Sequence, residues 1–342
     1  MIAIPGFTLI KKIQANGPGE VWWASSEHAD QLVTLHFLTL DSPAKPEDQQ
    51  RFMREAALCA QMQHPGLVRF LAQGITGNTL WFATELVDSS SLQQFIAKRG
   101  PLTTDDAINV LDQTLEIVIY LHQQDVVHRS LHTQSLLVEK QAGALTVRLA
   151  DLGSAKCFQV AELHPITKLG ERGYPIHCFT APEALLDFAK LDARSDIYAL
   201  GAILYFVLTG HPPYEVSSED DLELTILEID PPPLLTLKSD LSPTIANVVE
   251  RAMSRNIEAR YQTAQEMHTA LHGAGKPVES SLINEIEWLR IQLIQHHANL
   301  LKLEEQVAIF GAGLAPLHLL NQIEAEREAI SRLEERLQAL GT

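Results

Sequence analysis

The chain has 342 residues, 46% of them hydrophobic, which is enough for two or three structural units around a large buried core. Its formal net charge of −17 argues against a nucleic-acid partner and against binding to an anionic membrane surface. The most apolar run, Ile197 to Leu208, is too short to span a bilayer, and the first residues lack the pattern of a secretory signal. Three cysteines without metal-binding spacing are typical of reduced thiols, so we expect a cytoplasmic protein.

The first 87 residues have the features of a small β-rich lobe. Strand patterns occur in five segments, at Phe7–Ile13, Val21–Ala24, Gln31–Leu40, Val68–Gly74 and Leu80–Leu86. The first two are separated by Asn16-Gly17-Pro18-Gly19, which is a turn sequence. Between the third and the fourth, Pro46 to Gln63 has apolar residues on one helical face. We therefore predict that residues 1–87 form a sheet accompanied by one helix.

Residues 88–273 are predicted to form a mainly helical lobe. The segment from Ala107 to Gln123 has apolar residues at a helical period and predicts a long amphipathic helix. Two short strand patterns, Ser135–Glu139 and Leu145–Leu149, follow it, and helical patterns then recur up to His272. The Gly- and Pro-containing residues 273–277 are a short linker that ends this part of the chain.

The tail, residues 274–342, has a different pattern. Apolar residues recur at steps of three and four on both sides of Gly311-Ala-Gly313, which predicts two heptad helices packed as an antiparallel hairpin or coiled coil. Each predicted helix carries one polar residue on its apolar seam, His296 in the first and Glu326 in the second. The two side chains either pair across the hairpin or each reach out to water, and we expect the second arrangement.

A series of short motifs runs through the first 272 residues in a fixed order. The motifs are the hairpin of residues 13–24 with Gly19 and Val21, Val33-Thr34-Leu35-His36, Arg54-Glu55, His64-Pro65, Thr84-Glu85-Leu86-Val87, His128-Arg129-Ser130-Leu131-His132-Thr133-Gln134-Ser135, Asp151-Leu152-Gly153, Ala181-Pro182-Glu183, Ser195-Asp196-Ile197-Tyr198 and Arg260. Each motif alone is weak, but their joint order resembles that of the eukaryotic-like serine/threonine protein kinases of bacteria. The resemblance covers roughly residues 7–272.

This resemblance implies an α+β fold with two lobes, a β-rich N-lobe and a helical C-lobe, followed here by the helical hairpin. It also implies a nucleotide cleft between the lobes. The residues at the cleft positions of the family are Gly19, Val21, Thr34, Glu55, Glu85, Val87 and Leu137. Asp151 stands at the position of a magnesium ligand, and His128, Glu183, Asp196 and Arg260 stand at positions that anchor the catalytic loop and the large lobe.

Several positions depart from the family pattern. His36 stands where the family has the lysine that neutralises the nucleotide phosphates, and we expect it to be a satisfied core histidine. Ser130 stands where the family has the carboxylate base of the catalytic loop. Ser135 stands where the family has the asparagine that binds the second magnesium. His132 stands where the family has the lysine that follows the base. Gln14 and Asn16 stand where the family has the first two glycines of the phosphate-covering loop. Their side chains occupy space that the family leaves open.

The motif series therefore keeps the structural residues of a kinase and loses the reactive ones. We predict a catalytically impaired kinase-like protein, a pseudokinase, that acts as a signalling scaffold or regulator through protein contacts. One alternative is an ATP-binding serine/threonine kinase with residual or atypical phosphotransfer, in which His132 or His36 takes over a missing role. Another is a nucleotide sensor that binds ATP and magnesium without hydrolysis. The hairpin is predicted to recruit a protein partner or a second copy of the chain, with mere packing against the C-lobe as the alternative.

Overall fold

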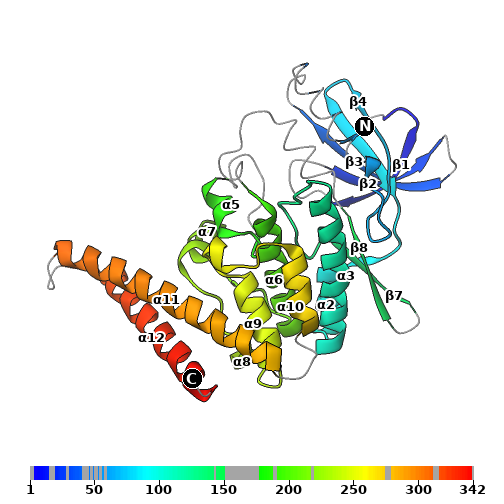
Figure 1. The fold of residues 1–342 in the computed structure, drawn as a ribbon. Coiled ribbons are helices and arrows are strands. Elements are labelled where there is room, and N and C mark those ends of the chain that lie inside the picture. Colours follow the sequence, from blue (N-terminus) through cyan, green and yellow to red (C-terminus); the bar gives the residue numbers. More distant parts are fainter. Residues whose placement is uncertain are drawn as a thin grey trace.

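The structure is a computed structural model that describes residues 4–14, 20–27, 31–40, 46, 49, 53, 56–57, 60–141, 144–150, 177–187, 191–216, 219–273, 279–310 and 316–340. These residues form a β-rich lobe, a larger helical lobe and a pair of long helices that extends from the helical lobe (Figure 1). The predicted two-lobed α+β fold with a helical hairpin is confirmed.

The β-rich lobe is a five-stranded antiparallel sheet. In spatial order its strands are β1 (Phe7–Gln14), β2 (Glu20–Ser26), β3 (Gln31–Thr39), β5 (Thr79–Glu85) and β4 (Phe70–Thr76). Side chains alternate between the two faces of a strand, so each face of the sheet buries its own apolar set. Leu35 and Trp81 belong to the cluster on one face, whereas Leu80 and Phe82 pack with Ala56 of the helical segment on the other.

Strand β4 begins two residues later than the predicted Val68–Gly74, because the preceding backbone pairs with the other lobe. The N–H of Leu149 donates to the oxygen of Gly66 at 2.7 Å, and the N–H of Val68 donates to the oxygen of Leu149 at 2.9 Å. A Cβ atom on Gly66 would lie 2.5 Å from Cγ1 of Ile117, so the close approach requires glycine here. This segment ties the sheet to the helical lobe.

The helical lobe is arranged around one central helix. Its elements are β6 (Ser90–Ser91), α2 (Leu92–Arg99), α3 (Thr104–Gln123), β7 (Leu136–Gln141), β8 (Ala144–Leu149), α5 (Pro182–Leu186), α6 (Ala193–Thr209), α7 (Glu219–Glu228), α8 (Leu234–Leu237), α9 (Pro243–Ala252), the 3₁₀ turn η2 (Ile257–Ala259) and α10 (Ala264–Gly273). Helix α6 contains the apolar run noted in the sequence and is buried on nearly all sides, as expected of a core helix. It begins at the capping residue Asp192 and ends at Gly210, whose φ of 77° few other residues adopt.

The tail forms the predicted hairpin of α11 (Glu279–Phe310) and α12 (Leu317–Ala339). The seam positions with described side chains are buried or half-buried. The most buried of them are Leu289, Leu319, Ile323 and Ile330. The expectation for the polar seam residues was wrong. Nδ1 of His296 lies 2.5 Å from Oε2 of Glu326, so the two side chains pair across the hairpin instead of reaching out to water.

The hairpin packs against the helical lobe near the start of α11 and the end of α12. Leu289 is completely buried there, and Nη2 of Arg336 donates to Oδ1 of Asn247 on α9 at 2.9 Å. The other end of the hairpin points away from the body of the protein (Figure 1). Among the described residues, no helix combines the length and the apolar character that a bilayer crossing needs.

Candidate functional site

The start of the loop of residues 128–135 is hydrogen-bonded to a carboxylate on α6. Asp196 is completely buried, and its Oδ2 accepts a hydrogen bond from the N–H of His128 at 2.8 Å and from Nε2 of His122 at 2.9 Å. Its Oδ1 accepts from the N–H of Arg129, also at 2.8 Å. Arg129 has a φ of 67°, an uncommon value for a residue with a side chain, which these backbone hydrogen bonds stabilise. The loop backbone is therefore fixed whatever side chains stand on it.

His132 is a neutral acceptor within this loop. Its Nδ1 accepts hydrogen bonds from the N–H groups of Gln134 and Ser135, each at 3.2 Å, so that nitrogen carries no proton. Burial, followed by the nearby His177 and His128, lowers the pKa of His132 well below its usual value. His132 therefore does not supply the positive charge of the lysine that the family has at this position.

Ser135 uses its hydroxyl group to close the loop. The side chain is completely buried, and Oγ donates to the oxygen of His132 at 2.7 Å and accepts from the N–H of the same residue at 3.3 Å. The oxygen of Ser135 accepts from the N–H of Ala150 at 2.8 Å, which ties the loop to the residue before the predicted metal ligand. The hydroxyl is thus engaged in a local turn rather than directed as a metal ligand.

Ser130 stands beside a void of about 20 Å³, which is room for one water molecule. The void is lined by Arg129, Ser130, Leu131, His177, Phe179, Thr180, Ala181, Ala184, Ser195 and Ala199. None of these described lining residues is acidic, so none of them offers a carboxylate in place of the missing base. Gly19, Glu55 and Asp151, which the sequence assigned to the cleft and the metal, lie outside the described residues.

His36 lies within the apolar layer of the sheet, as the sequence predicted for a core histidine. It is directly opposite Val21 on β2 and Phe82 on β5, and directly paired residues share a face. Its ring stacks on that of Phe82 with centroids 4.5 Å apart and planes 8° apart, and only 7% of the residue is exposed. The imidazole is therefore buried on one face of the sheet, where it packs on Phe82.

Three residues that the sequence assigned to the adenine side of the cleft are described in the structure. Val21, Thr34 and Leu137 are half-buried, on β2, β3 and β7 respectively. The N–H of Glu85 donates to the oxygen of Arg69 at 2.9 Å, so this N–H is engaged within the protein. The oxygen of Val87 accepts from the N–H of Ser89 at 3.0 Å.

The Glu85 side chain is engaged between the lobes. Its Oε1 accepts from the N–H of Arg69 at 2.9 Å and forms an ion pair with Nη2 of Arg148 on β8. Glu85 therefore joins the sheet to β8 of the helical lobe, a role that its position in the motif series did not reveal.

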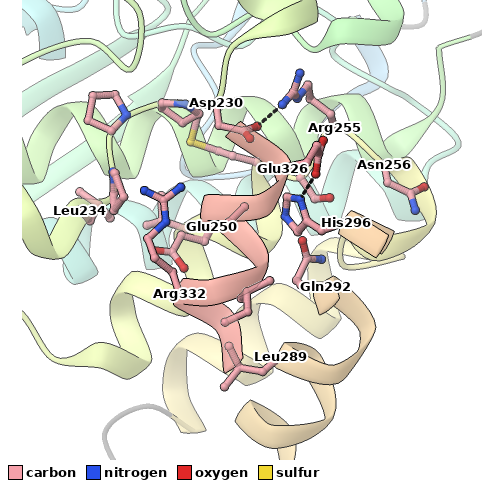
Figure 2. A pocket seen from close by; sticks show the side chains of 18 of the residues that line it. Asp230, Leu234, Glu250, Arg255, Asn256, Leu289, Gln292, His296, Glu326 and Arg332 are labelled. Carbon is pink, nitrogen blue, oxygen red and sulfur yellow. Dashed lines mark hydrogen bonds and ion pairs between the residues drawn. The ribbon is translucent and has the colours of Figure 1, made fainter. Parts of the chain in front are cut away.

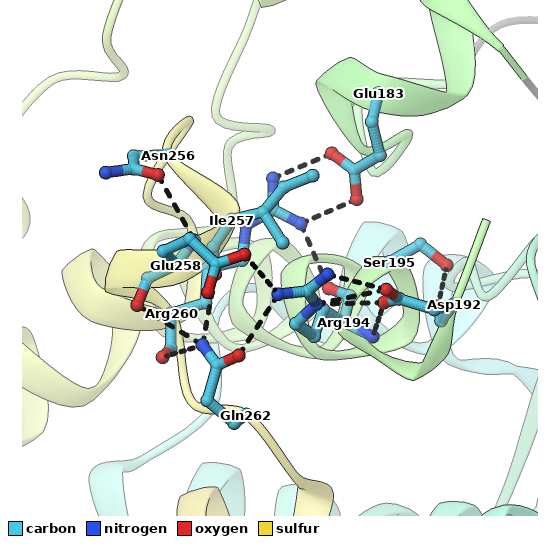
Figure 3. A network of polar contacts seen from close by, with 9 residues as sticks. All are labelled: Glu183, Asp192, Arg194, Ser195, Asn256, Ile257, Glu258, Arg260 and Gln262. Atoms are coloured by element: carbon cyan, nitrogen blue, oxygen red, sulfur yellow. Dashed lines mark hydrogen bonds and ion pairs between the residues drawn. The ribbon is translucent and has the colours of Figure 1, made fainter. Parts of the chain in front are cut away.

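Arg260 and Glu183 lock the helical lobe together (Figure 3). Arg260 is completely buried, and its Nη1 and Nη2 donate to the two carboxylate oxygens of Glu183 at 2.7 and 2.8 Å. The guanidinium also donates to backbone oxygens, from Nε to Ser254 at 2.6 Å and from Nη1 to Arg194 at 3.0 Å. Two parallel charge-assisted bonds fix both position and orientation. The start of α5 is thereby bound to α6 and to η2.

A second arginine, which the motif series did not include, lies beside this pair. Arg194 donates to both carboxylate oxygens of Asp192 and to Glu258 and Gln262 (Figure 3). Hydrogen bonding to Asp192 raises the pKa of Arg194 above its usual value. The sequence contained one sign of this arrangement, because Asp192 lies two residues before Arg194 at the start of a helical pattern. An aspartate at that position typically caps the first turn of the helix.

One cysteine, Cys178, lies in the described part of the chain and is a free thiol. It packs between the main core and the cluster around Tyr214. Burial raises the pKa of the Cys178 thiol to about 12, so the group stays protonated at neutral pH. This agrees with the expected reduced thiol, while Cys59 and Cys157 lie outside the described residues.

A cavity of about 660 Å³ separates the hairpin from the helical lobe (Figure 2). Its walls come from residues 227–234 and 249–256 of the lobe and from the two hairpin helices. Two ion pairs border it, His296 with Glu326 and Arg255 with Asp230, the latter at 2.6 Å. The walls of the cavity carry both polar and apolar side chains, and the cavity belongs to the contact between hairpin and lobe.

Known proteins resemble this chain over its first 270 or so residues. Residues 7–271 match the family model for the protein kinase domain. The probable serine/threonine-protein kinase PknB of Lactococcus lactis is 28% identical over 264 residues, and PrkC of Bacillus subtilis is 25% identical over 269. These matches cover 77% and 78% of this chain but 41% and 40% of the relatives, so the chain spans less than half the length of the curated relatives that it matches.

Solved structures show the same fold. The PknI kinase domain of Mycobacterium tuberculosis superimposes with a TM-score of 0.61 at 22% identity, and the match covers 80% of this chain and 98% of that domain. The sheet of five strands, the loop held by Asp196 and the Arg260–Glu183 pair all fall within the matched residues. The chain belongs to the protein kinase domain family.

Proposed function

We propose that this chain is a pseudokinase, a kinase-fold protein with impaired phosphoryl transfer that acts through contacts with other proteins. The observation that carries the proposal is the loop of residues 128–135. Its backbone is held by Asp196, yet it presents Ser130 at the base position, a neutral His132 and a Ser135 engaged in its own turn. Loss of a positioned base alone typically lowers a rate by ~10²–10⁴-fold.

Serine/threonine kinase activity is the second candidate. The specific observation in its favour is that the curated relatives are named serine/threonine-protein kinases, and by themselves these names support activity rather than impairment. The names describe those proteins, whereas the residues of the loop are those of this chain. Transfer by this chain would need a base and a second metal ligand from outside the described loop residues, since Ser130 and Ser135 do not provide them.

An ATP-labelling experiment separates the two candidates. The chain is incubated with labelled ATP and magnesium, beside Asp151→Ala and beside the triple variant His36→Lys/Ser130→Asp/Ser135→Asn. We expect the wild type to incorporate no more label than Asp151→Ala. The triple variant should incorporate more, because the loop backbone that carries the new side chains is already in place. Wild-type incorporation that disappears in Asp151→Ala would support the kinase and end the pseudokinase proposal.

Nucleotide binding without transfer is tested separately by thermal unfolding. A nucleotide present at a hundred times its dissociation constant stabilises the folded state by about 2.7 kcal/mol. We expect no stabilisation with millimolar ATP and magnesium, because His36 is stacked on Phe82 within the sheet and His132 is neutral. A stabilisation of this size would favour the nucleotide sensor.

The hairpin supports the second part of the proposal, a contact with another chain. Ile294 and Leu301 on α11 are 70% and 59% exposed. They are seven residues apart, so they lie on one stripe of the helix, outside the seam that faces α12. A heptad stripe of this kind fits the same stripe of another helix, and we propose that the partner is a second copy of the hairpin.

A further inference from the structure

Three ligand-type side chains converge on the surface of the helical lobe, away from the nucleotide cleft. His268 and His272 are one turn apart on α10, and both face Asp112 on the neighbouring helix α3. Oδ1 of Asp112 lies 3.0 Å from Nε2 of His268 and 2.7 Å from Nε2 of His272. The two Nε2 atoms are 3.2 Å from each other. Three donor atoms therefore form a small triangle.

The dimensions of this triangle are close to those of a metal site. Zinc binds imidazole nitrogen at about 2.0–2.1 Å and carboxylate oxygen at about 2.0–2.2 Å, so two ligand atoms of a tetrahedral site are about 3.3 Å apart. The observed separations of 2.7, 3.0 and 3.2 Å need to expand by only a few tenths of an ångström. Side chains of intermediate or high exposure can make this adjustment, and all three residues are of that kind.

The triangle is poorly explained by hydrogen bonds alone. If both Nε2 atoms carry protons, two N–H groups crowd toward one carboxylate oxygen within 3.2 Å of each other. If one of them carries no proton, its lone pair faces the lone pairs of the Asp112 oxygen. A cation at the centre of the triangle removes both conflicts, because all three atoms then direct lone pairs at it.

We propose that Asp112, His268 and His272 bind a divalent transition-metal ion of the zinc type. Two imidazoles and one carboxylate suit Zn²⁺, Co²⁺ or Ni²⁺, whereas Mg²⁺ and Ca²⁺ prefer oxygen ligands. Three protein ligands leave one coordination position for water. The site joins α3 to α10 at the end of the helical lobe. It is independent of the nucleotide cleft and of whether that cleft transfers phosphate.

Calorimetric titration tests the proposal on the intact chain after removal of metals with a chelator. We expect one equivalent of Zn²⁺ to bind, and Mg²⁺ to give no signal at this site. His268→Gln, His272→Gln and Asp112→Asn should each weaken zinc binding by at least about 100-fold, since loss of even an outer-shell partner costs 10–100-fold. Titration with Co²⁺ should give the visible absorption of tetrahedral cobalt in the wild type and lose it in the variants.

His211→Gln is the matched control. Nδ1 of His211 lies 3.0 Å from Oε1 of Glu215, which is an exposed histidine–carboxylate pair without the second histidine of the triangle. Zinc binding should be unchanged in this variant. His272 is half-exposed, so its replacement leaves the fold intact, and far-UV circular dichroism checks this. Absence of zinc binding in the wild type would overturn the proposal, and so would wild-type affinity in His268→Gln/His272→Gln.

Discussion

Two histidines beside Ser130 give the loop a defined response to pH. The rings of His132 and His177 are 4.7 Å apart, and burial lowers the pKa of both below the usual value. An unfolded chain binds protons at these positions near pH 6.5, whereas the folded chain does not. Protonation therefore favours the unfolded state. The free energy of unfolding decreases as the pH falls from about 6.5 toward the pKa values of the two histidines in the folded chain.

The first prediction is that His132→Asn reduces this pH dependence. Each such histidine contributes a slope of up to about 1.4 kcal/mol per pH unit to the free energy of unfolding below pH 6.5. The oxygen of an asparagine can accept the backbone N–H groups that Nδ1 accepts now, but it does not titrate. Urea unfolding at pH 7.5 and at pH 5.5 measures the effect. The same loss of stability in wild type and variant on acidification would contradict it.

At the scale of elements, the central helix depends on a glycine. A Cβ atom at Gly201 would lie 2.8 Å from Cβ of Ala252 and 2.9 Å from Cγ of Met253, so α6 and α9 pack too closely for a side chain. We expect Gly201→Ala to destabilise the fold by about 1–3 kcal/mol through overpacking, more than the ~1 kcal/mol gained from helix propensity. Gly273→Ala is the control, because a Cβ there meets nothing within 4 Å. Equal urea midpoints for both variants would refute this account.

The hairpin depends on its polar pair. His296 and Glu326 are about four-fifths buried and bonded to each other, and Asn299 also approaches the carboxylate. His296→Leu and Glu326→Leu should each cost about 1–3 kcal/mol, because each leaves a buried polar partner unsatisfied. The double variant should be nearly as stable as wild type, since apolar residues often replace a buried ion pair without loss. A double-mutant cycle measures the coupling, and additive single effects would disprove it.

The pattern of elements was predictable from the sequence, and the details of side chains were less so. Period-two and period-3.6 patterns located the sheet, α3 and both hairpin helices, because those patterns follow directly from which face is buried. The start of β4 was missed, since its preceding residues pair with Leu149, which is distant in the sequence. Heptad spacing placed His296 and Glu326 on the seam but did not determine whether their side chains meet.

The candidate site shows the same division. Motif order indicated the positions of Ser130, His36 and Ser135, but the sequence contained no sign that Nδ1 of His132 accepts two backbone N–H groups. The spacing of His268 and His272 is visible in the sequence as two histidines four residues apart. Their third partner, Asp112, comes from another helix, so the triangle becomes evident only from the packing of α3 against α10.

At the scale of the whole molecule, the exposed stripe on α11 predicts self-association. We expect the intact chain to form a dimer, and Ile294→Glu/Leu301→Glu to be a monomer, because the charges prevent burial of the stripe. Leu224→Glu is the control, since Leu224 is 57% exposed on α7 and is not part of the hairpin helices. Analytical ultracentrifugation gives the masses. A monomeric wild type, or a variant that stays dimeric, would exclude a second copy as the partner of this stripe.

The triangle on the surface also bears on the order in which the protein folds. Asp112 and His272 are 160 residues apart in the chain, so bringing them together closes a very long loop at a cost in entropy that local helical contacts do not incur. Because α10 also rests on α6 and α9, we expect its docking to be among the last steps of folding. Pulsed hydrogen exchange during refolding should show protection of α6 amides first, and earlier protection of α10 would reverse this order.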